Sequence, residues 1–280
     1  MKIPYKADSA TLTPAPHMMY SNEIVVPDDR RAYGLFISRF QGTWEPKPWQ
    51  DYVIAKCTDG YEKDPLYDTF KTTARNEGKV FGATHYLRSA LNWSEQTDVF
   101  LEHSQDADFL SIDFEGIGNT PSEAFAWNSQ KATIKAREES KKKVAFYSSP
   151  KYVQEWMYPF GVYWVRDYED LWIAQWPYSN WSDRLLEVPL LNGGWFPRLP
   201  AGCKHWRFWQ YGAEYLERGE YEGVGSKHVC LEVFYGTVAD LRAWCGQSEP
   251  PQPPEPETTG CNVFMAKIAK IVDEWKEQPE

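Results

Sequence analysis

Short apolar runs alternate with longer amphipathic stretches along most of this chain. The apolar runs have the length of buried strands, and the stretches between them show the three-to-four-residue spacing of helices. Strands are predicted over seven ranges: 33–38, 52–57, 80–87, 109–113, 144–147, 171–176 and 205–211. Helices are predicted over 65–77, 93–105, 121–142 and 150–156. Regular alternation of strand and helix predicts an α/β fold with a mainly parallel sheet, and this number of units favours a closed barrel.

Segments of different composition flank the alternating pattern. Residues 1–30 are polar and contain proline, which predicts an N-terminal extension. Residues 247–260 form a proline-rich linker that cannot join a core. Residues 261–280 place apolar side chains at helical spacing and predict a short helix. Docking of this helix on the barrel is favoured over self-association or contact with a partner such as a virion. The barrel domain is therefore expected over 31–246.

The charge and the hydropathy pattern limit the partners of this chain. Its 280 residues carry a formal net charge of −10, which argues against nucleic acid because such a partner calls for a basic stripe. No apolar stretch reaches membrane-spanning length, and the N-terminus lacks the apolar core of a signal peptide. We therefore expect a protein made in the cytoplasm, with no membrane partner.

Aromatic residues are abundant, with 14 Trp, 17 Tyr and 14 Phe. Tyr and Trp suit surfaces that are both apolar and hydrogen-bonding, and sugar rings present such a surface, although most of these side chains are assigned to the core. The five cysteines and five histidines show neither paired spacing nor the spacing of a zinc site. We therefore expect free thiols in a reducing compartment, and no metal or cofactor.

Asp113 and Glu115 close the apolar run that begins at Phe109. Side chains two apart on a strand point to the same face, about 6.5 Å apart along the chain. Each charge raises the proton affinity of the other, a cost that an acid–base site can use. The same pattern also occurs where a strand simply runs out into solvent. In a parallel barrel, however, this strand end is the one at which active sites lie.

Eight short motifs occur in order between about residues 33 and 246. They are Gly34–Ser38 with Phe40–Gly42, Ile54–Gly60, Gly82–Arg88, Ile112–Glu115, Phe146–Ser149, Leu171–Ala174, Trp206–Tyr211 and Val229–Gly236. Together they resemble the motifs of glycoside hydrolase family 25, the Chalaropsis-type lysozymes of bacteria, fungi and phages. The resemblance implies an irregular TIM-like (β/α) barrel.

The resemblance also implies an activity, namely cleavage of the β-1,4 bond between N-acetylmuramic acid and N-acetylglucosamine in peptidoglycan. The D-x-E motif of the family corresponds to Asp113 and Glu115. Glu115 is then the general acid, and Asp113 assists the acetamido group of the substrate as it attacks the anomeric carbon. This chemistry requires a neutral Glu115 and an ionised Asp113, so we expect their environments to separate the two pKa values.

Several positions depart from the family pattern. The aspartate of the first strand is Phe36, and the aspartate and asparagine of the last strand are Cys230 and Glu232. Thr84 stands where the family has tyrosine. Glu232 is a candidate replacement carboxylate, and Asp59 lies at an acidic position of the family. We count Phe36, Asp59 and Glu232 among the candidate substrate-binding residues.

Five further candidates for substrate binding come from the same motifs: His85, Tyr147, Trp172, Trp209 and Tyr211. For His85 a buried structural role is an equal alternative, and Trp172 is equally well explained as core. Three functions remain open. The first is an active muramidase acting on walls after release from a cell or as part of a virion. The others are a catalytically impaired wall-binding or virion structural module, and a glycosidase acting on another N-acetylated glycan.

Overall fold

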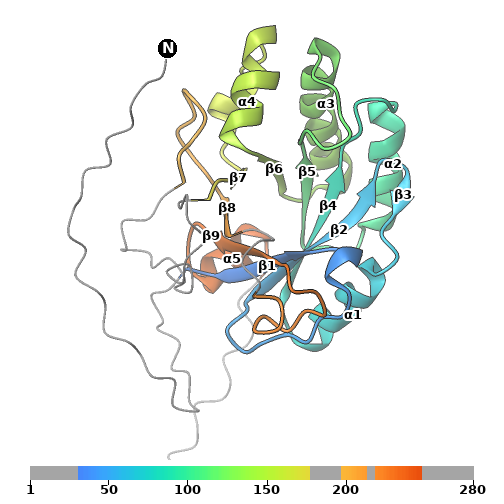
Figure 1. Ribbon diagram of the computed structural model, residues 1–280, viewed down its shortest axis with the longest axis vertical. Coiled ribbons are helices and arrows are strands. Elements are labelled where there is room, and N and C mark those ends of the chain that lie inside the picture. The colour runs from blue at the N-terminus through green and yellow to red at the C-terminus, as the bar shows by residue number, and fades with distance from the viewer. Residues whose placement is uncertain (1–30, 177–196, 213–217, 248–280) are drawn as a thin grey trace, which may run out of the picture.

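The computed structural model of the chain describes residues 31–176, 197–212 and 218–247 (Figure 1). The predicted N-terminal extension, the predicted C-terminal helix and nearly all of the predicted linker lie outside these ranges. The barrel prediction over 31–246 lies within them except for residues 177–196 and 213–217.

The strands of the described residues form one sheet that closes on itself. They are β1 (Tyr33–Ile37), β2 (Tyr52–Asp59), β3 (Glu62–Lys63), β4 (Val80–Tyr86), β5 (Phe109–Asp113), β6 (Val144–Ser148), β7 (Leu171–Ala174), β8 (Phe208–Gly212) and β9 (Cys230–Phe234). The order is β1-β9-β8-β7-β6-β5-β4-β2-β3, and an additional β1–β2 pairing joins the two ends. The short β3 only pairs with the end of β2, so the other strands make a closed α/β barrel, as predicted.

Strand β9 makes this barrel irregular. It runs antiparallel to both β1 and β8, whereas the other barrel pairings are parallel. The apolar pattern predicted neither β9 nor the helix that follows it. The strand is five residues long, and the charged Glu232 at its centre interrupts the apolar run that would indicate a buried strand.

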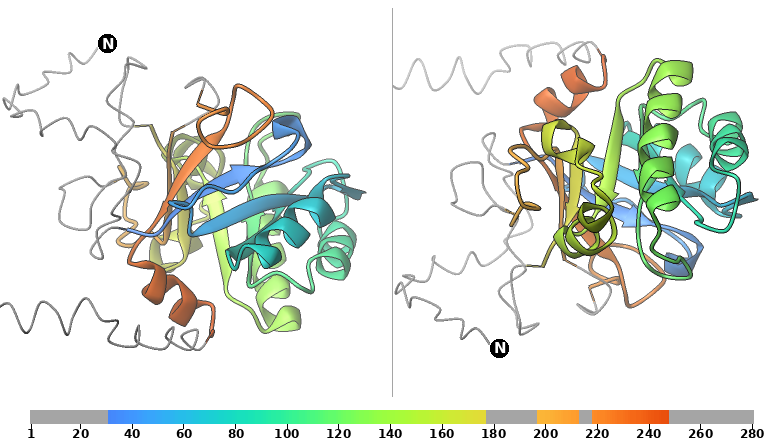
Figure 2. Two further views of the ribbon diagram at one scale, coloured as in Figure 1. Left: turned by 90° about the horizontal axis from the view of Figure 1, so that it is seen from below. Right: turned by 90° about the horizontal axis from the view of Figure 1, so that it is seen from above.

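Helices cover the outside of the barrel (Figure 2). They are α1 (Tyr67–Asn76), α2 (Trp93–His103), α3 (Glu123–Ser140), α4 (Pro150–Trp156) and α5 (Val238–Trp244), with 3-10 turns η1 (Arg39–Gln41), η2 (Tyr158–Phe160) and η3 (Trp164–Asp167). The N-terminal side-chain caps of α2, α3, α4 and α5 are Asn92, Ser122, Ser149 and Thr237, each accepting a backbone N–H. Such caps stabilise a helix by about 1 kcal/mol each. No helix in the described ranges is long and apolar enough to cross a membrane.

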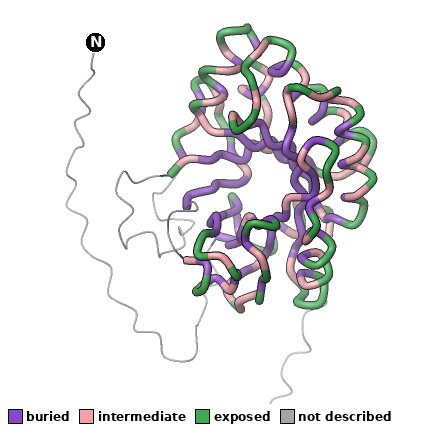
Figure 3. Tube along the Cα trace, turned by 45° about the vertical axis from the view of Figure 1, so that its right-hand side comes forward, coloured by how far each residue is buried: buried purple, intermediate pink, exposed green. Residues whose placement is uncertain are grey.

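Buried residues line the ring of strands on both faces (Figure 3). One core lies between strands and helices, and a second fills the barrel interior. At the N-terminal end of the parallel strands, Phe109 stacks on Phe208 with ring centroids 5.0 Å apart, and Trp244 of α5 packs 5.4 Å from Phe208. Gly82 makes room for this packing, because a Cβ there would lie 2.4 Å from the Phe109 ring. The aromatic floor leaves the opposite end of the barrel for the polar residues.

Candidate active site

Asp113 and Glu115 lie at the C-terminal end of β5, opposite the aromatic floor. Asp113 is the last residue of the strand and is 2% exposed, whereas Glu115 is half-buried in the loop that follows. In the strand register Asp113 lies between Tyr86 of β4 and Tyr147 of β6. The charges of both carboxylates raise the pKa of each tyrosine, after the larger effect of burial. The two carboxylates therefore share one environment with two phenols.

The surroundings of Asp113 favour its neutral form. Burial is the largest cause that raises the pKa of Asp113 well above its usual range, and the charge of Glu115 adds to it. Lys56 acts in the opposite direction. Among the described residues, Asp113 Oδ1 has no hydrogen-bond partner. The direction for Asp113 is thus opposite to the one expected from the sequence, because desolvation outweighs the nearby cation.

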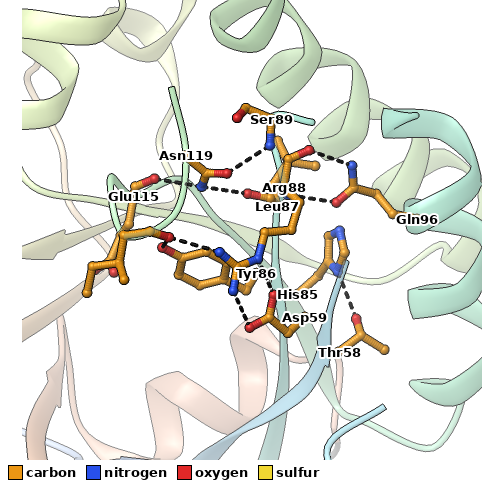
Figure 4. Close-up of polar contacts among 11 residues, drawn as sticks. Thr58, Asp59, His85, Tyr86, Leu87, Arg88, Ser89, Gln96, Glu115 and Asn119 are labelled. Carbon is orange, nitrogen blue, oxygen red and sulfur yellow. Dashed lines mark hydrogen bonds and ion pairs between the residues drawn. The ribbon is translucent and has the colours of Figure 1, made fainter. Parts of the chain in front are cut away.

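Asp59 lies near this pair but is committed to an ion pair (Figure 4). Both of its carboxylate oxygens accept from the Arg88 guanidinium, with Nη2 and Oδ2 2.7 Å apart. Arg88 Nη1 also donates to the carbonyl of Ile117 at 2.9 Å, as does the Tyr86 hydroxyl at 2.8 Å. The structure therefore gives Asp59 a supporting role, in which it orients the arginine that holds the loop after β5.

Asn119 fixes the same loop from its other side (Figure 4). Its Nδ2 donates to the carbonyls of Glu115 at 2.8 Å and Leu87 at 2.9 Å, and its Oδ1 accepts from Ser89 N at 2.8 Å. These bonds join the segment that carries Glu115 to the end of β4. Sequence reasoning did not single out Asn119, which lies outside the quoted motifs.

His85 does not join the site. Its Nδ1 lies 2.7 Å from Thr58 Oγ1, and its ring stacks on Phe100 of α2 with centroids 5.3 Å apart. Complete burial lowers the pKa of His85 to about 3, so the ring is neutral. It points towards the helical layer because it alternates with Thr84 and Tyr86 along β4. The contacts of His85 therefore indicate a buried structural role and not a contact with substrate.

The predicted aromatic residues divide between the two faces of the sheet. Tyr147 and Trp172 belong to the barrel interior, whereas Trp209 and Tyr211 belong to the core between strands and helices. The Trp209 indole donates to the carbonyl of Gln175 at 2.7 Å. Trp209 and Tyr211 are buried on the outer face of β8 and therefore do not line the barrel interior, contrary to the expectation of a common sugar-stacking wall.

Phe36 of β1 and Cys230 of β9 form an apolar pair across two neighbouring strands of the barrel. They are direct partners in the β1–β9 register, and the Phe36 ring packs edge-on against Trp172 with centroids 5.5 Å apart. Phe36 is partly exposed, so its ring narrows the interior but is not sealed within it. This pair occupies the two positions at which the family pattern has aspartates.

Glu232 lies deeper in the barrel and is fully buried. Its Oε2 accepts from the Trp172 indole at 2.7 Å and its Oε1 from Gln210 Nε2 at 2.9 Å. Burial raises the pKa of Glu232 well above its usual range, and these two hydrogen bonds lower it. Glu232 is therefore too deeply buried for substrate to contact it directly. Gln210 was missed, although a polar residue between Trp209 and Tyr211 in a buried strand is a recognisable signal.

The sequence of this chain matches a known family and a protein of Escherichia coli. The model of the glycosyl hydrolases family 25 matches residues 37–219. A protein of Escherichia coli K12 called uncharacterized protein YegX is 25% identical over 235 residues, covering 79% of this chain and 76% of that protein.

Solved structures share the fold. The lysozyme of Streptomyces coelicolor aligns with a TM-score of 0.58 and 21% identity over 78% of this chain and 98% of its own. The family 25 lysozyme of Aspergillus fumigatus aligns with a TM-score of 0.59 and 18% identity, over 76% of this chain and 98% of its own. The catalytic domain of endolysin ply40, from a phage of Listeria monocytogenes, aligns with a TM-score of 0.57 and 16% identity, over 78% of this chain and 98% of its own. The family match covers well over half of the chain, which therefore belongs to glycosyl hydrolases family 25.

Proposed function

We propose that this protein is a peptidoglycan hydrolase that cleaves the β-1,4 bond between N-acetylmuramic acid and N-acetylglucosamine. The observation that carries the proposal is the Asp113–Glu115 pair, which lies at the C-terminal end of a family 25 barrel between two tyrosines. Lysozymes and muramidases among its structural relatives act on this class of polymer.

Glu115 is the acid in this proposal. It gives its proton to the glycosidic oxygen as the bond to the anomeric carbon breaks. A water molecule then attacks the anomeric carbon and displaces the acetamido oxygen that has bonded there, and the Glu115 carboxylate takes a proton from this water, which restores the acid. The half-buried position of Glu115 allows contact with a polymer, whereas fully buried Asp113 is reached only by a group that enters the barrel mouth.

Asp113 assists the acetamido group of the substrate. The amide N–H of that group donates to Asp113 Oδ1, the oxygen that lacks a partner among the described residues. As the acetamido oxygen attacks the anomeric carbon, positive charge develops on the amide nitrogen. A carboxylate that accepts a hydrogen bond from this N–H stabilises the charge, because the surrounding dielectric is low. Binding of this donor also favours the ionised form of Asp113 against its desolvation.

The Glu115→Gln variant tests the assignment. Loss of the proton donor is expected to lower the rate of reducing-end release from purified cell walls by about 10²–10⁴-fold, with wall binding retained. Glu102→Gln, which changes an exposed glutamate of α2, is the matched control and keeps full activity. Full activity of the Glu115 variant would remove this residue from the role of acid.

One observation favours a second function. Phe36 and Cys230 form an apolar pair at two positions where the family pattern has acids, and loss of one supporting polar group typically costs about 2–4 kcal/mol of transition-state stabilisation. A wall-binding module without turnover would bind purified walls and release no reducing ends.

The same assay with chitin-like oligomers identifies a glycosidase of different specificity. We propose that the protein acts on walls after release from a cell, in line with the endolysin domain among its structural relatives, or else as part of a virion.

A further inference from the structure

A small pocket lies at the C-terminal ends of β1 and β2, beside the proposed site. Its lining residues are Arg39, Phe40, Lys56, Asp59, Glu62 and Asp64. Arg39 and Phe40 belong to η1, directly after β1, and the others come from β2, β3 and the turn that follows. The pocket adjoins the carboxylates, because Lys56 Nζ lies 4.9 Å from the centre of the Tyr86 ring and Tyr86 is the register partner of Asp113.

Phe40 presents an exposed aromatic ring at this pocket. It is 65% exposed, and the Arg39 guanidinium carbon lies 5.2 Å and Lys56 Nζ 6.0 Å from the centre of its ring. The apolar face of a sugar ring packs on such an aromatic surface, and nearby cations attract a negatively charged substituent. A single exposed apolar residue needs no explanation, but this one lies beside two cations at the mouth of the barrel.

The turn that carries Phe40 is fixed by the protein itself. Ser38 and Gln41 form a capping box around η1. Asp64 Oδ2 accepts from the backbone N–H of Arg39 at 3.0 Å, which ties the turn to the segment after β3. The ring therefore needs little ordering when a ligand binds, and this lowers the entropic cost of binding.

Arg39 and Lys56 form no ion pair in the part of the chain that the structure describes. Lys56 follows the interior residue Ile54 by two positions on β2, so it points into the barrel mouth. The partner of Ile54 on β1 is Phe36, which carries no charge where the family pattern has an aspartate. The charge of Lys56 is therefore not neutralised from β1.

The acids of the pocket are engaged elsewhere or exposed. Asp59 is paired with Arg88. The carboxylate of Asp64 accepts from two backbone N–H groups. Glu62 is exposed, so water and ions screen its charge. The pocket thus combines two cations with one exposed aromatic ring.

We propose that Arg39, Phe40 and Lys56 form a subsite that selects acidic glycans, in which a sugar ring packs on Phe40 and a carboxylate of the substrate binds to the two cations. The proposal rests on the function proposed above and specifies which glycans the site prefers. In peptidoglycan the carboxylate belongs to the lactyl ether of N-acetylmuramic acid or, where that group carries a stem peptide, to the peptide. Neutral glycans such as chitin have no such group.

The position of the subsite fits the proposed position of the substrate. The acetamido group that Asp113 is proposed to bind is attached to carbon 2 of N-acetylmuramic acid, and the lactyl ether is attached to the adjacent carbon 3. Strand β2 is two strands away from β5 in the sheet, a distance of about 10 Å. The lactyl chain and the long flexible stem of Lys56 extend towards each other across this distance. Arg39 is exposed, so it also meets a carboxylate that lies farther out.

The test measures binding and not turnover. Three glycans are titrated by calorimetry into the full-length protein carrying Glu115→Gln, so that they are not cleaved. They are a peptide-free tetrasaccharide of alternating N-acetylglucosamine and N-acetylmuramic acid, its methyl ester, in which the carboxylates are neutral, and the same tetrasaccharide with stem peptides. We expect the acid form to bind with a Kd about tenfold lower than that of the methyl ester, because charge-assisted hydrogen bonds are lost in the ester.

Removal of the two cations separates charge recognition from the rest of binding. Arg39→Gln and Lys56→Met each reduce the preference for the carboxylate, and the double variant abolishes it while the Kd of the methyl ester stays within about twofold. Lys143→Met removes an exposed cation at the opposite end of the barrel, so it is the matched control and keeps the preference. Arg39 is exposed, so its variant reports even if the substitution of Lys56 prevents folding.

Removal of the ring affects all glycans alike. Phe40→Ala is expected to raise the Kd of the acid and of its methyl ester by the same factor, about fivefold, because stacking does not depend on the carboxylate. Unchanged Kd values in this variant overturn the role assigned to the ring.

The three glycans also identify the source of the carboxylate. A preference for the peptide-free acid over its ester supports the lactyl group, and a preference for the peptide-bearing form alone, lost in the double variant, supports the stem peptide. Equal Kd values for all three glycans overturn the proposal, as does a preference that survives in the double variant or an absence of binding by every glycan. Hydrolysis of walls by the parent protein is measured separately, so a lack of turnover refutes the proposed function while the Kd values still decide this inference.

Discussion

At the scale of single residues, the site combines a carboxyl group whose pKa is raised by burial with another that is partly exposed to solvent. Asp113 is buried with one oxygen unsatisfied among the described residues, an arrangement that lowers the stability of the folded protein. Glu115, two residues later, is half-buried. The substrate amide proposed to bind Asp113 donates a hydrogen bond to the oxygen that lacks a donor among the described residues. The unpaired oxygen lowers the stability of the free protein, and the new hydrogen bond contributes to substrate affinity.

The pH dependence of stability follows from the raised pKa of Asp113. The folded protein holds this proton more tightly than the unfolded chain does, so stability is lost as pH rises above about 4 and until it reaches the folded-state pKa. The Asp113→Asn variant has no such loss. It is expected to be more stable than the parent at pH 7, by about 1–3 kcal/mol, and this gain disappears below about pH 4.

Urea unfolding at several pH values checks this prediction, with Asp167→Asn at an exposed position as control. A variant that is less stable than the parent at pH 7 would show that Asp113 contributes favourable interactions in the folded state. Activity is expected to fall in the same variant, because the neutral amide does not stabilise the charge on the acetamido group.

At the scale of elements, the loop after β5 carries the acid and is held by groups from β2, from β4 and from the segment that follows β4. The Asp59–Arg88 pair and Asn119 bind the backbone of this loop on two sides. The ion pair is partly exposed, so its contribution to stability is small and its main effect is geometric. The hydrogen bonds of Asn119 are the more specific constraint.

Asn119→Ala tests the constraint on the loop. Loss of three hydrogen bonds at half-buried positions is expected to cost about 1–3 kcal/mol of stability and to lower kcat by about 10-fold or more, with a smaller change in KM. Steady-state hydrolysis and thermal unfolding measure the two effects. Asn128→Ala on α3 is the matched control. An unchanged kcat would mean that the loop needs no anchor at this position.

At the scale of the whole molecule, the barrel has an aromatic floor at one end and the polar site at the other. Trp244 packs against Phe109, Phe208 and Phe234, and its indole donates to Asp170 at 3.0 Å. Helix α5 therefore closes the interior from the side away from the carboxylates. Stability and catalysis depend on opposite ends of the same barrel.

Trp244→Ala separates the two ends. Removal of the indole is expected to cost about 2–5 kcal/mol, visible as a lower urea midpoint. The folded fraction keeps its specific activity, because the change is far from Asp113. Trp127→Ala, at an exposed position of α3, is expected to leave the midpoint nearly unchanged. A Trp244 variant that loses activity while folded would contradict this separation.

The apolar pattern was sufficient to predict the parallel part of the barrel and the position of the carboxylates at a strand end. It did not predict β9, because the charged Glu232 interrupts the apolar run of this short strand. Side chains along a strand point alternately to the two faces of the sheet, and this decides whether His85 or Trp209 faces the interior. The alternation depends on the exact strand boundaries, which could not be read from composition. The connections of Gln210 and Asn119 depend on residues distant in the sequence and became visible only in the structure.

We expect this chain to break one particular bond of peptidoglycan. Purified walls digested with the full-length protein and then reduced with borohydride give fragments whose end group is identified by mass spectrometry. We expect reduced N-acetylmuramic acid at the new ends formed by the parent protein, and no such ends from Glu115→Gln. Reduced N-acetylglucosamine at the new ends, or no new ends from a folded protein that binds walls, would contradict it.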